Sequence, residues 1–569
     1  MKIIFSLIFS LSVIISSTQI SFYKSTILDN ISTEVGFAIA FCDINNDGRD
    51  DLIRVEQEGK LRIFYQTDLT TMLQDSIYYD VSTETYSNWS IAVADIDKNG
   101  LRDIFIGGFK KSVILYQTLL GVFSAPEVTA PFFAQGANFI DINNDSWVDL
   151  FVCNDDGANF SYRNDTGVLS EDNTLISTAP YAGNYGSVWS DFDGDLDMDL
   201  YISKCRAGVT DPTDPRRING LYRNDGGTFT EMAASVGLDD GAQSWSADFG
   251  DIDNDGDMDF LLVNHYDSNR LFENLGGGVF QNISATCGLD MATTIYDFQS
   301  IFVDLDNDGF LDIVTANDNN QKIIYQNNGD KTFTPLTSLI DDCWSLSIGD
   351  INHDGFLDIY SSYAFGSGFD EALYINNTNT NNYVVFGLKG LQSNTDAIGS
   401  ILKLYGNWGV QTREVRAGES YGIQTTFNKH FGLGTETKID SLVVHFPSGK
   451  KCVIENINPN LFYELDEDCN FNIWTPPLSN IENNTALLKK INVYPNPVKD
   501  FLIIESSHLK GEISVSIFNS FGQEVKKVRT RKKSSTLSLA LDSLNEGFYI
   551  VSIRDDDGEV YRNKIEIRR

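Results

Sequence analysis

An acidic ten-residue loop that occurs seven times constrains this chain more than any other feature. Its clearest copy, DIDNDGDMDF at residues 251–260, has carboxylates at loop positions 1, 3, 5 and 9 and a glycine at position 6. Hard divalent cations take several oxygen ligands at short range, and alternating Asp residues in a tight loop supply them. The glycine permits the positive φ that a tight turn needs. Each loop is therefore a candidate cation site.

The loops recur at a nearly constant spacing. They begin at Asp43, Asp95, Asp141, Asp191, Asp251, Asp304 and Asp350, so the starts lie 52, 46, 50, 60, 53 and 46 residues apart. A repeat of roughly 40–50 residues is typical of one four-stranded blade of a β-propeller. The spacing therefore predicts a repeat array of β-sheets.

An EF-hand is the main alternative, and two features exclude it. An EF-hand loop needs a bidentate Glu at position 12, whereas position 12 is never Glu in these seven copies. Most residues two and six places before each first Asp are apolar, and apolar residues at even offsets predict a strand with one buried face. The residues six places before are Phe37, Trp89, Gln135, Tyr185, Trp245, Phe298 and Trp344. Loop position 10 is also apolar in every copy, so the predicted unit is strand, metal loop, strand.

The pattern WSADFGDIDNDGDMDF at residues 245–260 resembles the FG-GAP/VCBS repeats, a family that includes the integrin α-subunit propeller. The resemblance implies an all-β fold: a seven-bladed β-propeller over residues 22–385 with up to seven Ca²⁺ ions, one in each loop. The implied ligands are the side chains at loop positions 1, 3, 5 and 9 and the backbone carbonyl of position 7. These residues are Asp43, Asn45, Asp47, Arg49 and Asp51; Asp95, Asp97, Asn99, Leu101 and Asp103; Asp141, Asn143, Asp145, Trp147 and Asp149; Asp191, Asp193, Asp195, Asp197 and Asp199; Asp251, Asp253, Asp255, Asp257 and Asp259; Asp304, Asp306, Asp308, Phe310 and Asp312; and Asp350, Asn352, Asp354, Phe356 and Asp358.

A second β-rich unit is expected over residues 386–467. Its segments REVRAG at 413–418, HFGLG at 430–434 and DSLVVHFPSG at 440–449 resemble the ASPIC/UnbV module of cartilage acidic protein-like propellers. Phe446 stands where that family usually has Trp, and Ser400 stands where it usually has a residue such as Ala. The resemblance implies no established chemistry.

The N-terminal residues 1–19 predict a signal peptide. Lys2 precedes an apolar run from Ile3 to Ile15, and small residues follow at positions 16–18. A signal anchor is the alternative, but the run is shorter than the ~20 apolar residues of a membrane span. No other stretch approaches that length, so no transmembrane helix is expected in the mature protein.

The C-terminal part begins with a polar linker at residues 468–486, and a further domain is expected over residues 487–569. Its short alternating strands predict a small Ig-like β-sandwich. YPNP at 494–497 and LNEGFYIV at 544–551 resemble the C-terminal sorting domain of the type IX (Por) secretion system. The resemblance implies a Gram-negative, Bacteroidota-type source, handling by the type IX machinery, removal of this domain, and release or attachment at the outer cell surface.

The net charge of −38 argues against nucleic acid as a partner, because an acidic protein repels phosphate backbones. The seven Cys residues are scattered and odd in number, so they cannot all pair within the chain. Cys42 and Cys343 lie in strand-like flanks and are expected to be buried. Cys452 and Cys469 are candidates for a disulfide, but the sequence gives no geometry that settles it.

No catalytic motif stands out. Gly418-Glu-Ser-Tyr-Gly422 fits G-x-S-x-G, but that motif works at a strand-to-helix elbow, and no helical pattern follows it here. His353, at loop position 4, is expected to face solvent. The sequence therefore favours a secreted or cell-surface calcium-binding propeller that binds an extracellular glycan or protein surface and is not an enzyme. The alternatives are an extracellular propeller enzyme, such as a polysaccharide lyase or hydrolase, and a structural component of a cell-envelope complex.

Overall fold

The protein is seen here in a computed structural model, and its fold is all-β, as the sequence predicts. The structure describes residues 20–28, 35–56, 59–66, 72–80, 89–109, 111–124, 127–129, 131–265, 267–289, 296–318, 324–363, 371–474, 492–494, 498–499, 501–505, 512–519, 524–531, 536–541, 544–545, 547–554 and 560–568. The chain divides into two compact units, residues 1–476 and residues 477–569. The only helix in the described part is the single turn α1 (Ala233–Val236), and no described helix is long and apolar enough to cross a membrane.

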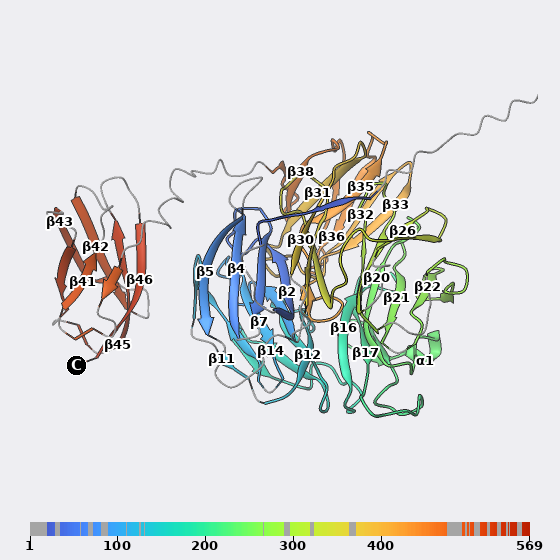
Figure 1. The fold of residues 1–569 in the computed structure, drawn as a ribbon, viewed down its shortest axis with the longest axis horizontal. Helices are drawn as coiled ribbons and strands as arrows, with labels where there is room; N and C mark the ends of the chain where they lie inside the picture. The colour runs from blue at the N-terminus through green and yellow to red at the C-terminus, as the bar shows by residue number, and fades with distance from the viewer. Residues whose placement is uncertain are drawn as a thin grey trace, which may run out of the picture. The chain divides into compact units, whose positions relative to one another are not determined.

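Seven sheets of the first unit share one antiparallel plan, with a metal loop between the first and second strand of each (Figure 1). Six of them comprise β2 (Val35–Cys42), β3 (Asp51–Glu56), β4 (Lys60–Gln66) and β5 (Met72–Asp80); β6 (Ser90–Ala94), β7 (Asp103–Gly107), β8 (Val113–Leu115) and β11 (Glu127–Val128); β12 (Ala134–Ile140), β13 (Asp149–Asn154), β14 (Phe160–Asn164) and β15 (Leu169–Glu171); β16 (Asn184–Ser190), β17 (Asp199–Lys204), β18 (Gly220–Asn224) and β19 (Phe229–Glu231); β20 (Ser244–Gly250), β21 (Asp259–Asn264), β22 (Arg270–Asn274) and β23 (Phe280–Asn282); and β24 (Tyr296–Val303), β25 (Asp312–Asp318), β26 (Ile324–Asn327) and β27 (Phe333–Leu336). A separate hairpin, β9 (Gln117–Leu119) and β10 (Val122–Phe123), follows β8.

The seventh sheet takes its outermost strand from the beginning of the unit. It comprises β28 (Ser345–Gly349), β29 (Asp358–Ser362), β30 (Ala372–Asn376) and β1 (Phe22–Lys24). The short strand β1 pairs antiparallel with β30, so that Phe22 lies opposite Asn376. One sheet therefore contains both the first described strand of the repeat array and its last three strands.

The first strands of the seven sheets contact one another in chain order. β2 contacts β6, β6 contacts β12, and the contacts continue through β16, β20 and β24 to β28, which in turn contacts β2. The residues two places before each metal loop are all buried, from Phe41 at 0% exposure to Phe302 at 9%. The predicted strand before each loop is therefore confirmed.

Two further sheets of the first unit form the second β-rich part of the chain, coloured yellow to orange in Figure 1. They comprise β31 (Asn382–Lys389), β35 (Lys429–Gly434), β38 (Phe462–Asp466) and β39 (Phe471–Ile473), and β32 (Ile401–Gly406), β33 (Gly409–Glu414), β36 (Ser441–His445) and β37 (Lys451–Ile454). β39 pairs with β38 and lies inside the first residues of the predicted linker, 468–486, of which residues 475–486 fall outside the described part.

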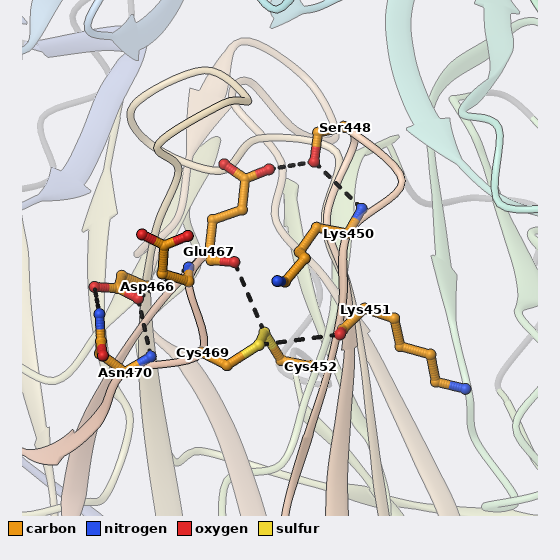
Figure 2. The surroundings of a disulfide bond; sticks show 9 residues. Ser448, Lys450, Lys451, Cys452, Asp466, Glu467, Cys469 and Asn470 are labelled. Carbon is orange, nitrogen blue, oxygen red and sulfur yellow. Dashed lines mark hydrogen bonds between the residues drawn. A yellow bond between two sulfur atoms is a disulfide. The ribbon is translucent and has the colours of Figure 1, made fainter.

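A disulfide joins the two sheets of this part, which confirms the candidate pair. Cys452 in β37 and Cys469 beyond β38 are bonded, with their Cα atoms 5.5 Å apart (Figure 2). Next to the disulfide, the fully buried carboxylate of Glu467 accepts hydrogen bonds from the backbone N–H of Leu391 (2.6 Å) and Ser393 (2.9 Å). The remaining five cysteines are free and buried, which confirms the expected burial of Cys42 and Cys343.

Residues 417–426 belong to the second β-rich part but lie between the first strands of the repeat sheets. We call them the plug segment. Its strand β34 (Ile423–Gln424) pairs parallel with β2. The backbone N–H of Phe139 in β12 donates to the carbonyl of Ala417 (2.9 Å), and Ser420 Oγ donates to the carbonyl of Ser300 in β24 (3.0 Å). The segment thus bonds to at least three of the seven first strands.

The side chain of Tyr421 lies at the centre of the residues six places before the metal loops. Its ring centroid is 5.0 Å from those of Phe37 and Trp245 and 6.0 Å from that of Tyr185. Phe298, Trp89 and Trp344 pack in the same cluster, and Tyr421 donates a hydrogen bond to Oε1 of Gln135. All seven positions therefore meet around one side chain that comes from outside the repeats.

The second compact unit contains two antiparallel sheets around one apolar core. The sheets comprise β40 (Asn492–Tyr494), β41 (Phe501–Glu505) and β44 (Thr536–Ala540), and β43 (Glu524–Arg531), β42 (Glu512–Asn519), β45 (Gly547–Arg554) and β46 (Val560–Ile567). Leu502, Val515 and Val551 are among its fully buried residues. The predicted signal peptide, residues 1–19, and residues 495–497 of the YPNP motif lie outside the described residues.

The expectation that His353 faces solvent is wrong. Its ring lies 3.6 Å from that of Phe462 and 4.4 Å from that of Trp474, centroid to centroid. Both aromatic residues belong to the second β-rich part, which covers this metal loop. Burial accordingly lowers the pKa of His353 to about 4.

Candidate metal centres

Each metal loop folds around the carboxylate at position 1. In the fifth loop, Oδ1 of Asp251 accepts the N–H of Asp255 and Oδ2 accepts the N–H of Gly256, both at 3.2 Å. The bond from the position 6 N–H to the position 1 carboxylate occurs in all seven loops. Position 5 in turn accepts the N–H of position 7 in every copy. The side chains thus wind the backbone into a tight, acid-lined turn.

Positions 4 and 6 of every loop adopt positive φ, which fits the prediction for glycine at position 6. Two loops achieve this conformation without glycine there, since Ser146 has φ 77° and Leu196 has φ 78°. In the Leu196 loop, Gly194 occupies position 4 with φ 79°. A non-glycine residue in this region costs roughly 1–2 kcal/mol, so the Ser146 loop, which has non-glycine residues at both positions, is strained relative to the others.

The carboxylate at position 9 clamps the loop to the neighbouring strands. It begins the second strand of each sheet, and its Oδ2 accepts the N–H of position 2 while its Oδ1 accepts an N–H at or near the third strand. In the fifth loop these donors to Asp259 are Ile252 (2.9 Å) and Asn274 (2.8 Å). The same pair of bonds occurs in the other six loops.

A set of amides that the sequence did not single out completes this clamp. Asn327 at the end of β26 donates to the carbonyl of Leu311 in its own loop (3.0 Å) and to that of Ile252 in the preceding loop (2.9 Å). Equivalent double bonds are made by Gln117, Asn164, Asn274 and Asn376. The sequence could have revealed these amides, because an Asn recurs at the end of similar segments such as Ile324-Tyr-Gln-Asn327.

Four loops bring three carboxylates close enough to share one ion. Their oxygens lie within 4.8 Å of one another in the groups Asp95, Asp97 and Asp103; Asp191, Asp193 and Asp199; Asp251, Asp253 and Asp255; and Asp304, Asp306 and Asp308. Predicted ligands from positions 1 and 3 are joined in all four groups, with position 9 in two and position 5 in the other two.

The remaining three loops do not gather three carboxylates within the described part of the chain. These loops begin at Asp43, Asp141 and Asp350 and have Asn45, Asn143 and Asn352 at position 3. An amide oxygen is therefore one of their four predicted side-chain ligands. At position 7 the predicted ligand is the backbone carbonyl oxygen, and its binding to the ion stays a prediction.

The loop carboxylates are poorly compensated in their present surroundings. Burial raises the pKa of Asp199 to about 9, and nearby Asp193 and Asp191 raise it further, against hydrogen bonds that lower it. Burial likewise raises the pKa of Asp103 to about 8 and that of Asp251 to about 7. Buried carboxylates of like charge favour ionisation only when a cation joins them. The electrostatics of the loops thus suit a positive ion.

Some buried carboxylate oxygens in the loops have no hydrogen-bond partner, and a bound cation would give them a partner. Oδ1 of Asp193, Asp253 and Asp304 is buried and has no hydrogen-bond partner. Each belongs to one of the four three-carboxylate groups. Buried carboxylate oxygens need a partner, and Ca²⁺ takes six to eight oxygen ligands. The donor sets of the three loops that begin at Asp191, Asp251 and Asp304 therefore fit Ca²⁺.

The second β-rich part bonds to several of the metal loops. Asp396 accepts the backbone N–H of Asp95 (2.7 Å), and Glu414 accepts that of Asp191 (2.9 Å). The N–H of Thr412 donates to Oδ2 of Asp251 (3.0 Å). The loops thus form an interface within the first unit as well as candidate ion sites.

The G-x-S-x-G segment is part of this interface and lacks the geometry of a hydrolase elbow. Ser420 is 2% exposed, and its hydroxyl is bonded to the carbonyl of Ser300. The segment leads into the strand β34, not into a helix. A nucleophile must reach substrate and base, which a serine buried among backbone carbonyls does not.

Three family models match the chain. FG-GAP-like repeats match residues 43–106, 209–262, 253–315 and 304–361, the model named ASPIC and UnbV matches residues 390–470, and the secretion system C-terminal sorting domain matches residues 492–568. FG-GAP-like repeats commonly bind calcium, in agreement with the acidic loops. The sorting domain indicates secretion and cell-surface attachment by the type IX machinery of Bacteroidota.

Individual proteins resemble the chain only distantly. An ulvan lyase, NLR42 of Nonlabens ulvanivorans, is 28% identical over 92 residues, which are 16% of this chain and 17% of the lyase. The extracellular domain of the putative hybrid two component system BT4673 from B. thetaiotaomicron aligns with 11% identity and a TM-score of 0.39 over 97% of this chain and 59% of that one. The BP39L lectin from Burkholderia pseudomallei aligns with 11% identity and a TM-score of 0.37, covering 58% of this chain and 94% of the lectin. Scores this low support no conclusion about function.

Proposed function

We propose that this chain is an extracellular binding or adhesion protein. The proposal rests on its combination of FG-GAP-like repeats, an ASPIC and UnbV domain and a type IX sorting domain. Its repeats form a closed seven-bladed β-propeller that Ca²⁺ stabilises. Its partner is a glycan or a protein surface outside the cell. It is not an enzyme. The C-terminal domain is an Ig-like β-sandwich that serves export.

The order of strand contacts supports the closed propeller. Each first strand contacts the next, and β28 contacts β2, as adjacent blades around an axis would. The pairing of β1 with β30 joins the two ends of the array in one blade. The plug segment then fills the axis, with Tyr421 among the seven inward-facing residues.

The acidic loops support up to seven Ca²⁺ ions with a structural role. Side chains at positions 1, 3, 5 and 9 and the carbonyl at position 7 would hold each ion, which supplies charge compensation to the buried carboxylates. The unpaired oxygens of Asp193, Asp253 and Asp304 make the loops that begin at Asp191, Asp251 and Asp304 the best candidates. The second β-rich part bonds to three of the loops, at Asp95, Asp191 and Asp251, which favours a structural ion over one that meets substrate.

Binding is favoured over catalysis because the one catalytic motif that the sequence offers, the G-x-S-x-G segment, has its serine buried. Burial lowers the pKa of His265 and of His430 to about 4. His430 is bonded to the carbonyl of Gly355 (3.0 Å). Propellers are common scaffolds for recognition, although a fold alone does not define a function.

Two rival functions follow from specific observations. The similarity to an ulvan lyase over 92 residues keeps a polysaccharide lyase as the first alternative. The sorting domain also fits a structural component of a cell-envelope complex. The domain boundaries at residues 22–385, 386–467 and 487–569 belong to the same proposal.

A glycan array combined with an activity screen tests the proposal. Secreted protein in 1–2 mM Ca²⁺, roughly an extracellular level for such modules, is applied to sulfated and neutral polysaccharides, and both retention and newly formed unsaturated ends are measured. Retention without cleavage supports binding. Cleavage would support the lyase. Retention on outer-membrane proteins alone, in a pull-down, would support the envelope component.

A further inference from the structure

A charged cavity lies where the second β-rich part meets the repeat sheets. Its volume is about 110 Å³, and its walls include Asp248 and Asp304 from the repeats and Arg413, Arg416 and Lys429 from the second part. This volume is several times the ~10–15 Å³ that a cavity needs to hold one water. A small polyatomic ion fits the same space.

One of the three cations in the wall is fully paired. Arg416 donates from Nη1 to Asp248 (2.8 Å) and from Nη2 to Glu414 (2.6 Å). Glu419, another acidic wall residue, accepts a hydrogen bond from Thr425 (2.6 Å). These groups satisfy one another and leave the other two cations to be explained.

Lys429 and Arg413 form no such direct ion pair. Glu419 and Asp50 attract the charge of Lys429, and Asp304 and Asp251 attract that of Arg413. Lys429 is 8% exposed and donates to the carbonyl of Thr426 (3.1 Å). Arg413 donates from Nη1 to the carbonyl of Thr412 (2.9 Å), whereas its Nη2 is buried without a partner. Neither side chain forms an ion pair with any carboxylate in the described part of the chain.

The two cations are also close enough to repel each other. Burial lowers the pKa of Lys429 first, and the charges of Arg416 and Arg413 lower it further, against the opposing effect of Glu419. Burying a charge is costly unless it is paired and hydrogen-bonded. A group that supplies negative charge to both Arg413 and Lys429 would remove this cost.

We propose that the cavity binds a small oxyanion, a sulfate, phosphate or carboxylate group, between Arg413 and Lys429. The planar fork of an arginine suits two oxygens of one anion, and a lysine adds a point charge with further donors. Asp304, the remaining acid in the wall, is position 1 of a metal loop, where a bound cation would neutralise it. An oxyanion here links the second β-rich part to the repeats.

The test uses the whole secreted chain in Ca²⁺ with sulfate as the probe. Calorimetry and thermal melting are followed as sulfate replaces chloride at constant ionic strength. Wild type is expected to bind one sulfate saturably, and Lys429→Met to bind it at least tenfold more weakly. Lys403→Met is the matched control, since Lys403 also donates from the second part to a repeat carbonyl, that of Gly256 (3.1 Å), but does not line the cavity.

Further arms keep the test decisive. Arg413→Gln replaces Lys429→Met if that variant does not fold, and crystals of wild type in selenate should show anomalous density between the two cations. Glucuronate, whose carboxylate is carried by a sugar, serves as an additional probe. We expect free sulfate to bind and glucuronate not to bind. The comparison separates a site for a free oxyanion from a site for an acidic sugar. The proposal would be overturned if wild type does not bind sulfate saturably, or if Lys429→Met and Lys403→Met bind it equally well. Neither result would bear on the response of the metal loops to calcium.

Discussion

Tyr421 donates the hydrogen bond that satisfies Gln135, the only strongly polar residue among the seven that point toward the axis of the repeats. Gln135 occupies the position that Phe, Tyr or Trp holds in the other six repeats. The irregular residue in the third repeat is thus explained by a side chain 286 positions away. The residues of the plug segment and those of the repeats are therefore complementary, as in a single folding unit.

Tyr421→Phe should destabilise the first unit by roughly 1–3 kcal/mol, because it leaves the buried Gln135 carbonyl unpaired. Tyr421→Ala should cost more, roughly 3–5 kcal/mol, since it also empties the centre of the aromatic cluster. Equilibrium urea unfolding in Ca²⁺ measures both changes.

Tyr181→Phe is the control for this pair, because Tyr181 is 45% exposed. A double variant with Gln135→Leu should recover part of the loss in Tyr421→Phe, since it removes both polar partners. Equal stability of Tyr421→Phe and wild type would show that the plug segment does not anchor the repeats.

The sequence predicted the strand, metal loop and strand of each repeat because those signals are local. Position 1 side chains bond to N–H groups four and five residues later, and the positive φ of position 6 was readable even where Ser146 replaces glycine. The candidate disulfide between Cys452 and Cys469 is confirmed, although its geometry could not be read from the sequence.

The contacts between distant segments could not be predicted in the same way. Gly418-Glu-Ser-Tyr-Gly422 carries no periodic pattern, and its contacts exist only once seven strands surround it. The burial of His353 could not be read from its own loop, because the rings that cover it, Phe462 and Trp474, come from a distant part of the chain. The three-residue strand β1 was too short to recognise before its partner β30 was known.

The seven loops should separate into two classes of Ca²⁺ affinity. The four loops that bring three carboxylates together should bind more tightly than those beginning at Asp43, Asp141 and Asp350. Among the weaker loops, the Asp141 loop also has the strained Ser146, at a cost of roughly 1–2 kcal/mol. Chelator competition should show that Asp304→Asn removes a tight site and that Asp141→Asn removes a weak one. Loss of the tightest site in Asp141→Asn would contradict this order.

Acid should weaken the second β-rich part through Glu467. Burial alone would raise the pKa of this carboxyl. Hydrogen bonds from Ser448 (Figure 2) and from the N–H groups of Ser393 and Leu391 outweigh this effect and lower the pKa to about 2. A carboxyl whose folded pKa is depressed stabilises the fold above its unfolded pKa of about 4.3, and this stability is lost as the pH falls toward 2.

Glu467→Gln should therefore destabilise the protein by roughly 2–4 kcal/mol at pH 7, as expected for a buried hydrogen-bonded charge. It should also flatten the loss of stability between pH 4.5 and pH 2.5, measured by urea unfolding, an interval set by the ordinary glutamate pKa of about 4.3. Glu464→Gln on the same strand is the control, because Glu464 is exposed. An unchanged pH profile in Glu467→Gln would rule out this role.

Export should remove both ends of the chain. Intact mass spectrometry of protein recovered from outside the cell is expected to lack about the first 19 residues and the last 80 or so, because a signal peptide and a sorting domain are cleaved during such export. Deletion of residues 487–569 should leave the protein in the periplasm. A full-length chain in the medium would contradict the processing.

The central claim is that Ca²⁺ stabilises the repeats, and melting with and without the ion tests it most directly. Extracellular Ca²⁺ modules have Kd values of ~10⁻⁴–10⁻³ M, so about 1 mM Ca²⁺ contributes roughly 0.4–1.4 kcal/mol per site. Seven such sites would contribute roughly 3–10 kcal/mol, comparable to the ~5–15 kcal/mol of a whole domain. Calorimetric scans of the secreted protein should therefore show a markedly lower melting temperature in EDTA than in 1 mM Ca²⁺, with Mg²⁺ restoring little of it. Equal melting temperatures in EDTA and Ca²⁺ would contradict the account.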